Sequence, residues 1–303
     1  MNWRGRRGSS NIRDVRGSSG RRRSSGLGGL GGLPIPIGGK KGGFSIVTLL
    51  IIVGVMWLFG INPLQLLTGG GSAGIQNQQS YDQSGATMSD TLYNMVSVVL
   101  ADTEEVWGQV FKEQLGKNYQ EPSMSIFSGS VNSGCGYASS QMGPFYCPLN
   151  QEIYIDLGFY TDLHRDFGAP GDFAMAYVVA HEVGHHVQKL TGVLDRVQEM
   201  KGRMSKEDAN ALQVKVELQA DYYAGLWAHY ASRYDDLLDE TDLQEALRAA
   251  GAIGDDMIQK RSQGYVVPES FTHGTSEQRR RWLLKGYKSG LVRDGDTFSA
   301  VNL

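Results

Sequence analysis

Residues 172–190 read DFAMAYVVAHEVGHHVQKL and contain the motif H-E-x-x-H as His181, Glu182 and His185. On a helix, residues four apart are separated by about 40° around the axis and one turn along it, so both imidazoles can bind one Zn²⁺. Glu182 then projects beside the metal, where a carboxylate can take a proton from bound water. The apolar run 174–180, with Asp172 as N-cap, predicts this helix over 172–190. A helix that merely contains two histidines is the alternative.

A catalytic zinc site needs a third protein ligand and one position left open for water. The candidates are acids on the following helix and the remaining histidines His164, His186, His229 and His273. His186 lies about 100° from its neighbour around the helix, so we expect it to pack or to hydrogen-bond elsewhere.

Glu217 is the better candidate for the third ligand. Glu217 and Asp221 lie four apart on an expected helix over 206–230 and share a face. Glu217 can then bind zinc while Asp221 accepts a hydrogen bond from a ligand histidine. The small residues Ala220, Ala224 and Gly225 favour a close approach between the two helices. A solvated acidic pair is the alternative.

The remaining patterns predict an α+β fold that is mainly helical and has a small sheet. Apolar spacing predicts further helices over 89–115, 242–260 and 276–285, and alternation predicts a strand over 152–157. Capping pairs support the helix starts, namely Ser205 with Asp208, Thr241 with Gln244 and Thr275 with Gln278.

The amino-terminal third differs in composition from the rest. Residues 1–43 hold 13 of the 40 glycines and ten of the 29 Lys and Arg against one acid, which predicts a disordered basic leader. Residues 44–67 carry no charge over 24 positions and predict one transmembrane helix. A buried core helix and a cleaved signal peptide are the alternatives. Residues 68–88 are rich in Gly, Ser and Gln and predict a flexible linker to a domain over 89–303.

The distribution of charge predicts a topology. Basic residues stay cytoplasmic beside a membrane span, so we expect the leader inside and the domain 89–303 outside a plasma (inner) membrane crossed once. The lipid bilayer is then a partner through 44–67. The chain after residue 43 is acidic, which argues against a nucleic-acid-binding domain, and DNA binding by the leader is the minor alternative.

The chain has two cysteines, Cys135 and Cys147, in a segment expected outside the cytoplasm. One disulfide between them is the simplest expectation, and two free buried thiols are the alternative. Two cysteines also exclude a disulfide-rich miniprotein and a cysteine-built zinc finger.

Four segments together resemble the bacterial family of neutral zinc metallopeptidases: AHEVGHHVQ at 180–188, ELQADYYAG at 217–225, FTHGTSEQR at 271–279 and GPFYCPLNQEIYID at 143–156. The resemblance extends to the basic leader and the single anchor. It implies a zincin-like domain of gluzincin type, in which His181, His185 and Glu217 bind zinc and Asp221 lies behind a ligand.

The same resemblance implies roles for three further features. In some membrane-associated gluzincins a segment like the one from His273 to Arg279 supplies a histidine that stabilises the tetrahedral intermediate, with the arginine nearby. A loop histidine beside an Arg-rich helix face is the alternative. In zincins the strand beside the metal binds extended substrate, which points to Ile153, Tyr154 and Ile155, although a plain structural strand is equally allowed.

These patterns predict a membrane-anchored endopeptidase that binds one Zn²⁺ per chain and acts on a protein or peptide substrate. Glu182 is the expected general base. A non-catalytic envelope protein that keeps a zincin fold to bind zinc is the rival interpretation, and the presence of Glu182 speaks against it.

Overall fold

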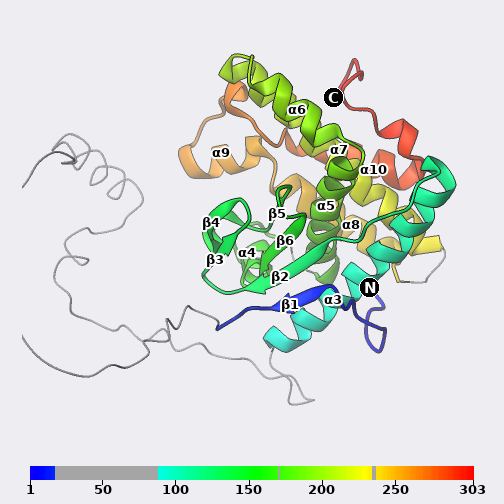
Figure 1. Cartoon of the computed structure of the whole chain (residues 1–303). Helices are drawn as coiled ribbons and strands as arrows, with labels where there is room; N and C mark the ends of the chain where they lie inside the picture. Colours follow the sequence, from blue (N-terminus) through cyan, green and yellow to red (C-terminus); the bar gives the residue numbers. More distant parts are fainter. Residues whose placement is uncertain (18–87, 170, 234–236) are drawn as a thin grey trace, which may run out of the picture. The chain divides into compact units, whose positions relative to one another are not determined.

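The computed structural model describes residues 1–17, 88–169, 171–233 and 237–303, shown in colour in Figure 1. Its α-helices are α3 (Met88–Val110), α4 (Phe159–Arg165), α5 (Asp172–Leu190), α6 (Val193–Lys201), α7 (Lys206–Arg233), α8 (Glu240–Ala252), α9 (Asp255–Gln263) and α10 (Ser276–Ser289). Its strands are β1 (Ile12–Asp14), β2 (Ser123–Phe127), β3 (Ser130–Ser133), β4 (Gly136–Ser139), β5 (Phe145–Cys147) and β6 (Glu152–Asp156). The predicted α+β class, mainly helical with small sheets, is confirmed.

Four strands form the main sheet, in the order β1-β2-β6-β5. The pairs β1–β2 and β2–β6 are parallel, whereas β5 runs antiparallel to β6. Ile153 pairs with Met124 on one side and with Tyr146 on the other. Strand β6 is therefore interior to the sheet, and β5 is an edge strand among the described elements.

Helix α5 runs through the middle of the helical part and contacts α3, α7, α8 and β5. Residues 173–180 are each at most 5% exposed, so this half of the helix is buried on every side. The helix spans 172–190 as predicted, but the predicted cap is wrong. Its N-cap is Gly171, and the Asp172 carboxylate instead accepts a hydrogen bond from Trp3 Nε1 at 2.8 Å.

Helix α7 approaches two neighbours closely through small residues. A Cβ on Gly184 of α5 would lie 2.9 Å from the carbonyl oxygen of Ala220, so the predicted close approach at Ala220 is confirmed. Gly225 serves a different contact, because its Cβ would lie 2.0 Å from the carbonyl oxygen of Leu283 on α10. Gly286 of α10 meets the Tyr222 carbonyl in the same way, also at 2.0 Å.

The predicted helix over 242–260 is wrong, because the chain breaks there into α8 and α9. Gly254 lies at the break, and a Cβ on it would lie 2.4 Å from the Ser276 amide nitrogen at the start of α10. The capping box of α8 uses Asp239 with Asp242 rather than the predicted Thr241 with Gln244. The predicted pairs Ser205 with Asp208 and Thr275 with Gln278 are both present.

The prediction of a disordered leader over 1–43 is wrong for residues 1–17. Strand β1 pairs with β2 in the main sheet, Trp3 is 6% exposed, and the Ser9 amide donates to the Ser97 carbonyl at 2.9 Å. Residues 1–17 and the domain after residue 88 thus fold as parts of one compact unit. Composition missed this because the contacts come from a few residues dispersed among glycines and arginines.

The apolar stretch 44–67, the rest of the leader and most of the predicted linker lie outside the described residues. Within the described ranges, no helix combines the length and apolarity needed to cross a bilayer. Cys135 and Cys147 form a disulfide, as predicted.

Candidate metal centre

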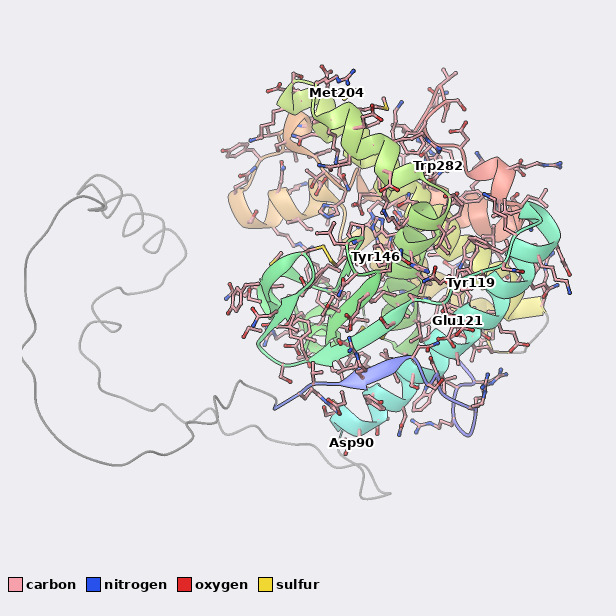
Figure 2. All side chains as sticks on the ribbon, viewed as in Figure 1. Asp90, Tyr119, Glu121, Tyr146, Met204 and Trp282 are labelled. Atoms are coloured by element: carbon pink, nitrogen blue, oxygen red, sulfur yellow. A yellow bond between two sulfur atoms is a disulfide. The ribbon has the colours of Figure 1, made fainter. Side chains whose placement is uncertain are left out.

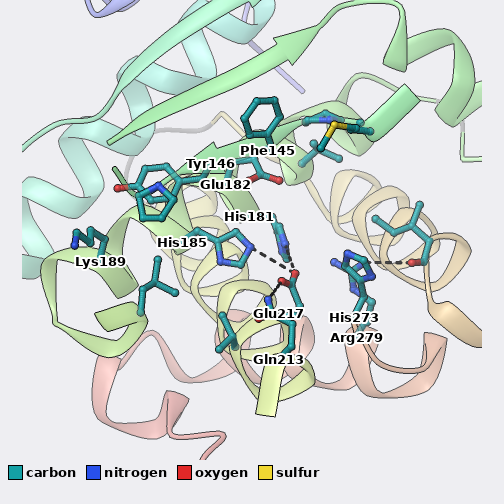
Figure 3. Close-up of a pocket in the computed structure, with 18 of the residues that line it drawn as sticks. Phe145, Tyr146, His181, Glu182, His185, Lys189, Gln213, Glu217, His273 and Arg279 are labelled. Carbon is teal, nitrogen blue, oxygen red and sulfur yellow. Dashed lines mark hydrogen bonds and ion pairs between the residues drawn. The ribbon is translucent and has the colours of Figure 1, made fainter. Parts of the chain in front are cut away.

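Helices α5 and α7 bring the three predicted ligands together (Figure 3). His181 Nε2 lies 3.2 Å and His185 Nε2 lies 3.5 Å from the same oxygen of Glu217, Oε2. One ligand atom from each residue falls within 4.8 Å of the other two. The close contact of Gly184 with Ala220 sets the helix separation at which these side chains meet.

The outward nitrogen of His181 is held by a buried carboxylate. Asp221 Oδ1 lies 2.8 Å from His181 Nδ1 and also accepts from the Tyr177 hydroxyl at 2.5 Å. Arg279 donates through Nε to Asp221 Oδ2 at 2.8 Å and through Nη2 to Oδ1 at 3.0 Å. Arg279 is 2% exposed, so it acts on Asp221, whereas its neighbours Arg280 and Arg281 are exposed.

The outward nitrogen of His185 is held by an amide. His185 Nδ1 lies 2.9 Å from Gln188 Oε1, and Gln188 Nε2 donates to the Val216 carbonyl at 2.7 Å. That second bond fixes the amide orientation, so His185 must be the donor at Nδ1. In both histidines Nδ1 therefore carries a proton, and Nε2, which faces Glu217 Oε2, is the nitrogen that can bind a metal once it has lost its own proton.

The surroundings of the centre favour the ionised form of both buried carboxylates. Burial raises the pKa of Asp221, but Arg279 and His181 outweigh it and lower that pKa to about 2. Burial likewise lowers the pKa of His181, but Asp221 and Glu217 raise it to about 10. Burial also acts against ionisation of Glu217, yet the two ligand histidines keep its pKa well below the usual range. Two imidazole nitrogens and one carboxylate oxygen beside a second buried carboxylate fit Zn²⁺.

The three ligands line a cleft of about 860 Å³, and Glu182 lies in its wall beside Tyr146 (Figure 3). Glu182 is 7% exposed. Tyr146, labelled near the centre of Figure 2, belongs to β5, so the edge strand forms part of this wall. The cleft therefore brings the Glu182 carboxylate, the three predicted metal ligands and an edge strand to one surface.

His273 also lines the cleft, on the side of Arg279 (Figure 3). Its Nδ1 lies 3.1 Å from Asp255 Oδ1, while Asp255 Oδ2 accepts from the amides of Thr272, His273 and Gly274 at 2.7, 2.6 and 3.1 Å. Burial raises the pKa of Asp255, but these bonds from His273 and its loop lower it overall. One carboxylate thus fixes both the loop and the ring.

The remaining predicted residues have other positions. His186 contacts the Tyr146 hydroxyl at 3.0 Å and the Gln120 carbonyl at 2.6 Å, so the expected role in packing or hydrogen bonding is confirmed. His229 contacts the Tyr287 carbonyl, and His164 is exposed on α4; neither lines the cleft. The assignment of substrate binding to Ile153, Tyr154 and Ile155 is wrong, because β6 is paired on both sides and these residues are at most 4% exposed.

Comparison with known proteins identifies relatives along the whole chain. A family model described as "Putative neutral zinc metallopeptidase" matches residues 1–298. "Uncharacterized protein YpfJ" of Escherichia coli K12 is 45% identical over 298 residues, which cover 98% of this chain and 99% of the relative. "Uncharacterized protein Rv2575" of Mycobacterium tuberculosis is 47% identical over 195 residues, 61% of this chain and 65% of the relative. No solved structure matches the chain significantly.

Proposed function

Since the chain belongs to the neutral zinc metallopeptidase family, we propose that it is a zinc-dependent endopeptidase. The observation that carries the proposal is the convergence of His181, His185 and Glu217 in a cleft that Glu182 also lines. A purely structural zinc site is closed and needs no neighbouring base. The likeness to zincins in fold and mechanism is part of this proposal.

Each residue has a task that follows from its contacts. Zinc, when bound by the three ligands, supplies a Lewis acid that polarises the peptide carbonyl and lowers the pKa of water. Glu182 removes the proton from the attacking water and delivers it to the departing amine. His273, with Nδ1 held by Asp255, can donate from Nε2 to the oxygen that gains negative charge, provided that the ring is protonated there.

Strand β5 is the element that we propose to bind the substrate backbone. Phe145 and Tyr146 line the cleft, and β5 pairs with β6 on only one side among the described strands. An extended peptide can add to such an edge through main-chain hydrogen bonds. The proposed substrates are therefore unfolded or extended polypeptides.

We also propose that the domain works outside the cytoplasm, in contact with a membrane. The disulfide between Cys135 and Cys147 supports an oxidising compartment. Membrane contact through residues 44–67 rests on their uncharged composition.

The test uses the full chain purified in detergent, because residues 1–17 are part of the folded unit. The wild-type protein should contain about one zinc per chain and should hydrolyse an unfolded protein such as reduced casein. A chelator should abolish hydrolysis, and added zinc should restore it. Glu182→Gln should retain zinc and lose about 10²- to 10⁴-fold in turnover, because the base is removed without removing a ligand.

Two results would count against the proposal. Hydrolysis that Glu182→Gln leaves unchanged would remove the mechanism. Bound zinc without any hydrolysis by the wild-type protein would favour the rival, a non-catalytic zinc-binding envelope protein.

A further inference from the structure

The two oxygens of the Glu217 carboxylate have different surroundings. Oε2 faces the Nε2 atoms of His181 and His185 at 3.2 and 3.5 Å. Oε1 points away from them and accepts a hydrogen bond from Gln213 Nε2 at 2.6 Å. Gln213 precedes Glu217 by four residues on α7, so the two side chains share one face of the helix.

Lys201 fixes which way the Gln213 amide faces. The Lys201 ammonium donates to Gln213 Oε1 from the last residue of α6. An ammonium has three donors and no acceptor, so the amide oxygen must face Lys201 and the amide nitrogen must face Glu217. Without Lys201, the Gln213 amide could turn either its oxygen or its nitrogen toward Glu217, and only the nitrogen can donate a hydrogen bond to the carboxylate.

Lys201 therefore donates to Gln213, and Gln213 in turn donates to Glu217. Both Lys201 and Gln213 line the cleft, and Lys201 is the end of α6, the helix that forms this wall. Gln188 holds His185 and Asp221 holds His181, and the contact from Gln213 gives the third ligand its own partner.

We propose that Lys201 and Gln213 are positioning residues that make Glu217 bind zinc through Oε2 alone. The inference rests on the zinc site proposed above. A carboxylate can bind a metal with one oxygen or with both, and a second oxygen would take the position that water needs. Because Oε1 is engaged by a donor on the side away from the histidines, turning it toward the metal costs that hydrogen bond.

Cobalt(II) bound in place of zinc gives a readout that is independent of activity. Visible absorption is strong for four-coordinate cobalt and weaker for five- or six-coordinate cobalt. The wild-type protein should show the strong spectrum. Gln213→Met keeps the length of the side chain and removes the donor, so its cobalt absorption should weaken as Oε1 joins the metal. Turnover of the zinc form should fall about 10- to 100-fold.

Matched variants separate this role from a general effect on the cleft. Gln198→Met changes another cleft-lining glutamine, on α6, and should keep the wild-type spectrum. Lys201→Met should weaken the cobalt absorption partway, whereas Lys201→Arg keeps a donor and should restore it. Equal spectra for these two variants would remove Lys201 from the chain of donors.

Failure of this inference is distinguishable from failure of the proposed function. A wild-type protein that binds neither zinc nor cobalt would overturn the zinc site itself. A wild-type protein that binds both, with a cobalt spectrum unchanged in Gln213→Met, would overturn only the role of Gln213. Circular dichroism on each variant confirms that the helices remain folded.

Discussion

His273 is more exposed than the three predicted zinc ligands, since its side chain is 49% exposed while Asp255 behind it is 12% exposed. If His273 stabilises the oxyanion, His273→Ala should retain zinc and lose about 10²- to 10³-fold in turnover. Asp255→Asn should lose less, because an amide oxygen can still accept from the loop amides. Steady-state kinetics and zinc content of both variants check this expectation.

The exposed His164 on α4 provides the control for His273. It lies outside the cleft, so His164→Ala should leave turnover unchanged. Turnover near the wild-type value in His273→Ala would leave the developing charge to the metal alone and would remove His273 from the site.

The ligands could be predicted from sequence because residues four apart on a helix must share a face. The same rule also places two further residues beside the histidines: Tyr177 lies four residues before His181, and Gln188 lies three after His185. Asp255 could not be found in this way. It meets His273 only because α9 and the loop before α10 are brought together across 18 residues of chain.

Among the elements, the contact between α7 and α10 depends most strictly on side-chain size. Gly286→Ala would place a methyl group against the Tyr222 carbonyl, so the two helices must separate. We expect a loss of about 1–3 kcal/mol or more in the free energy of unfolding. Zinc affinity should fall as well, because Arg279 reaches Asp221 from α10. Denaturant unfolding and zinc titration measure the two effects.

Gly108 is the matched glycine for that experiment. It lies inside α3, and a Cβ there would meet nothing within 4 Å. Gly108→Ala should therefore stabilise the protein by about 0.5–1 kcal/mol through helix propensity. Equal stability of the two variants would contradict the account of the α7–α10 contact.

Elements were predictable from local patterns where burial repeats along the chain, as in α5, α7 and β6. The break between α8 and α9 was not, since Gly254 is required by the distant amide of Ser276. The assignment of the substrate strand failed for a similar reason. Alternation in 152–157 shows a strand but not its neighbours, and pairing with β2 and β5 places β6 inside the sheet.

For the whole molecule, the largest departure from sequence-based expectation is the position of residues 1–17. Arg13 pairs with Glu152 of β6, and Arg16 pairs with Asp14, so part of the basic charge belongs to the fold. Basic residues orient a span mainly when they lie within about 20 residues of it. Only Lys40 and Lys41 lie that close to Phe44, which makes the topological signal weaker than the full leader suggests.

Sidedness can be measured by labelling single cysteines in intact cells. Ser10→Cys and Val301→Cys place thiols at exposed positions near the two ends of the folded unit. A membrane-impermeant thiol reagent should label both, or neither if the unit is cytoplasmic. If Val301→Cys is labelled and Ser10→Cys is not, the measurement is repeated after the membrane is permeabilised, with a cytoplasmic cysteine as the control for entry of the reagent. Ser10→Cys that still resists the reagent is buried. Ser10→Cys that becomes labelled only then lies on the other side of the membrane, which would contradict a shared side.

The parallel pairing of β1 with β2 thus constrains the membrane topology that the chain can have. A sheet cannot be continuous across a bilayer, so Ile12–Asp14 and Ser123–Phe127 must reach the same compartment before the sheet is complete. The predicted arrangement, with a cytoplasmic amino terminus and an outer domain joined by one crossing, cannot hold for this folded state.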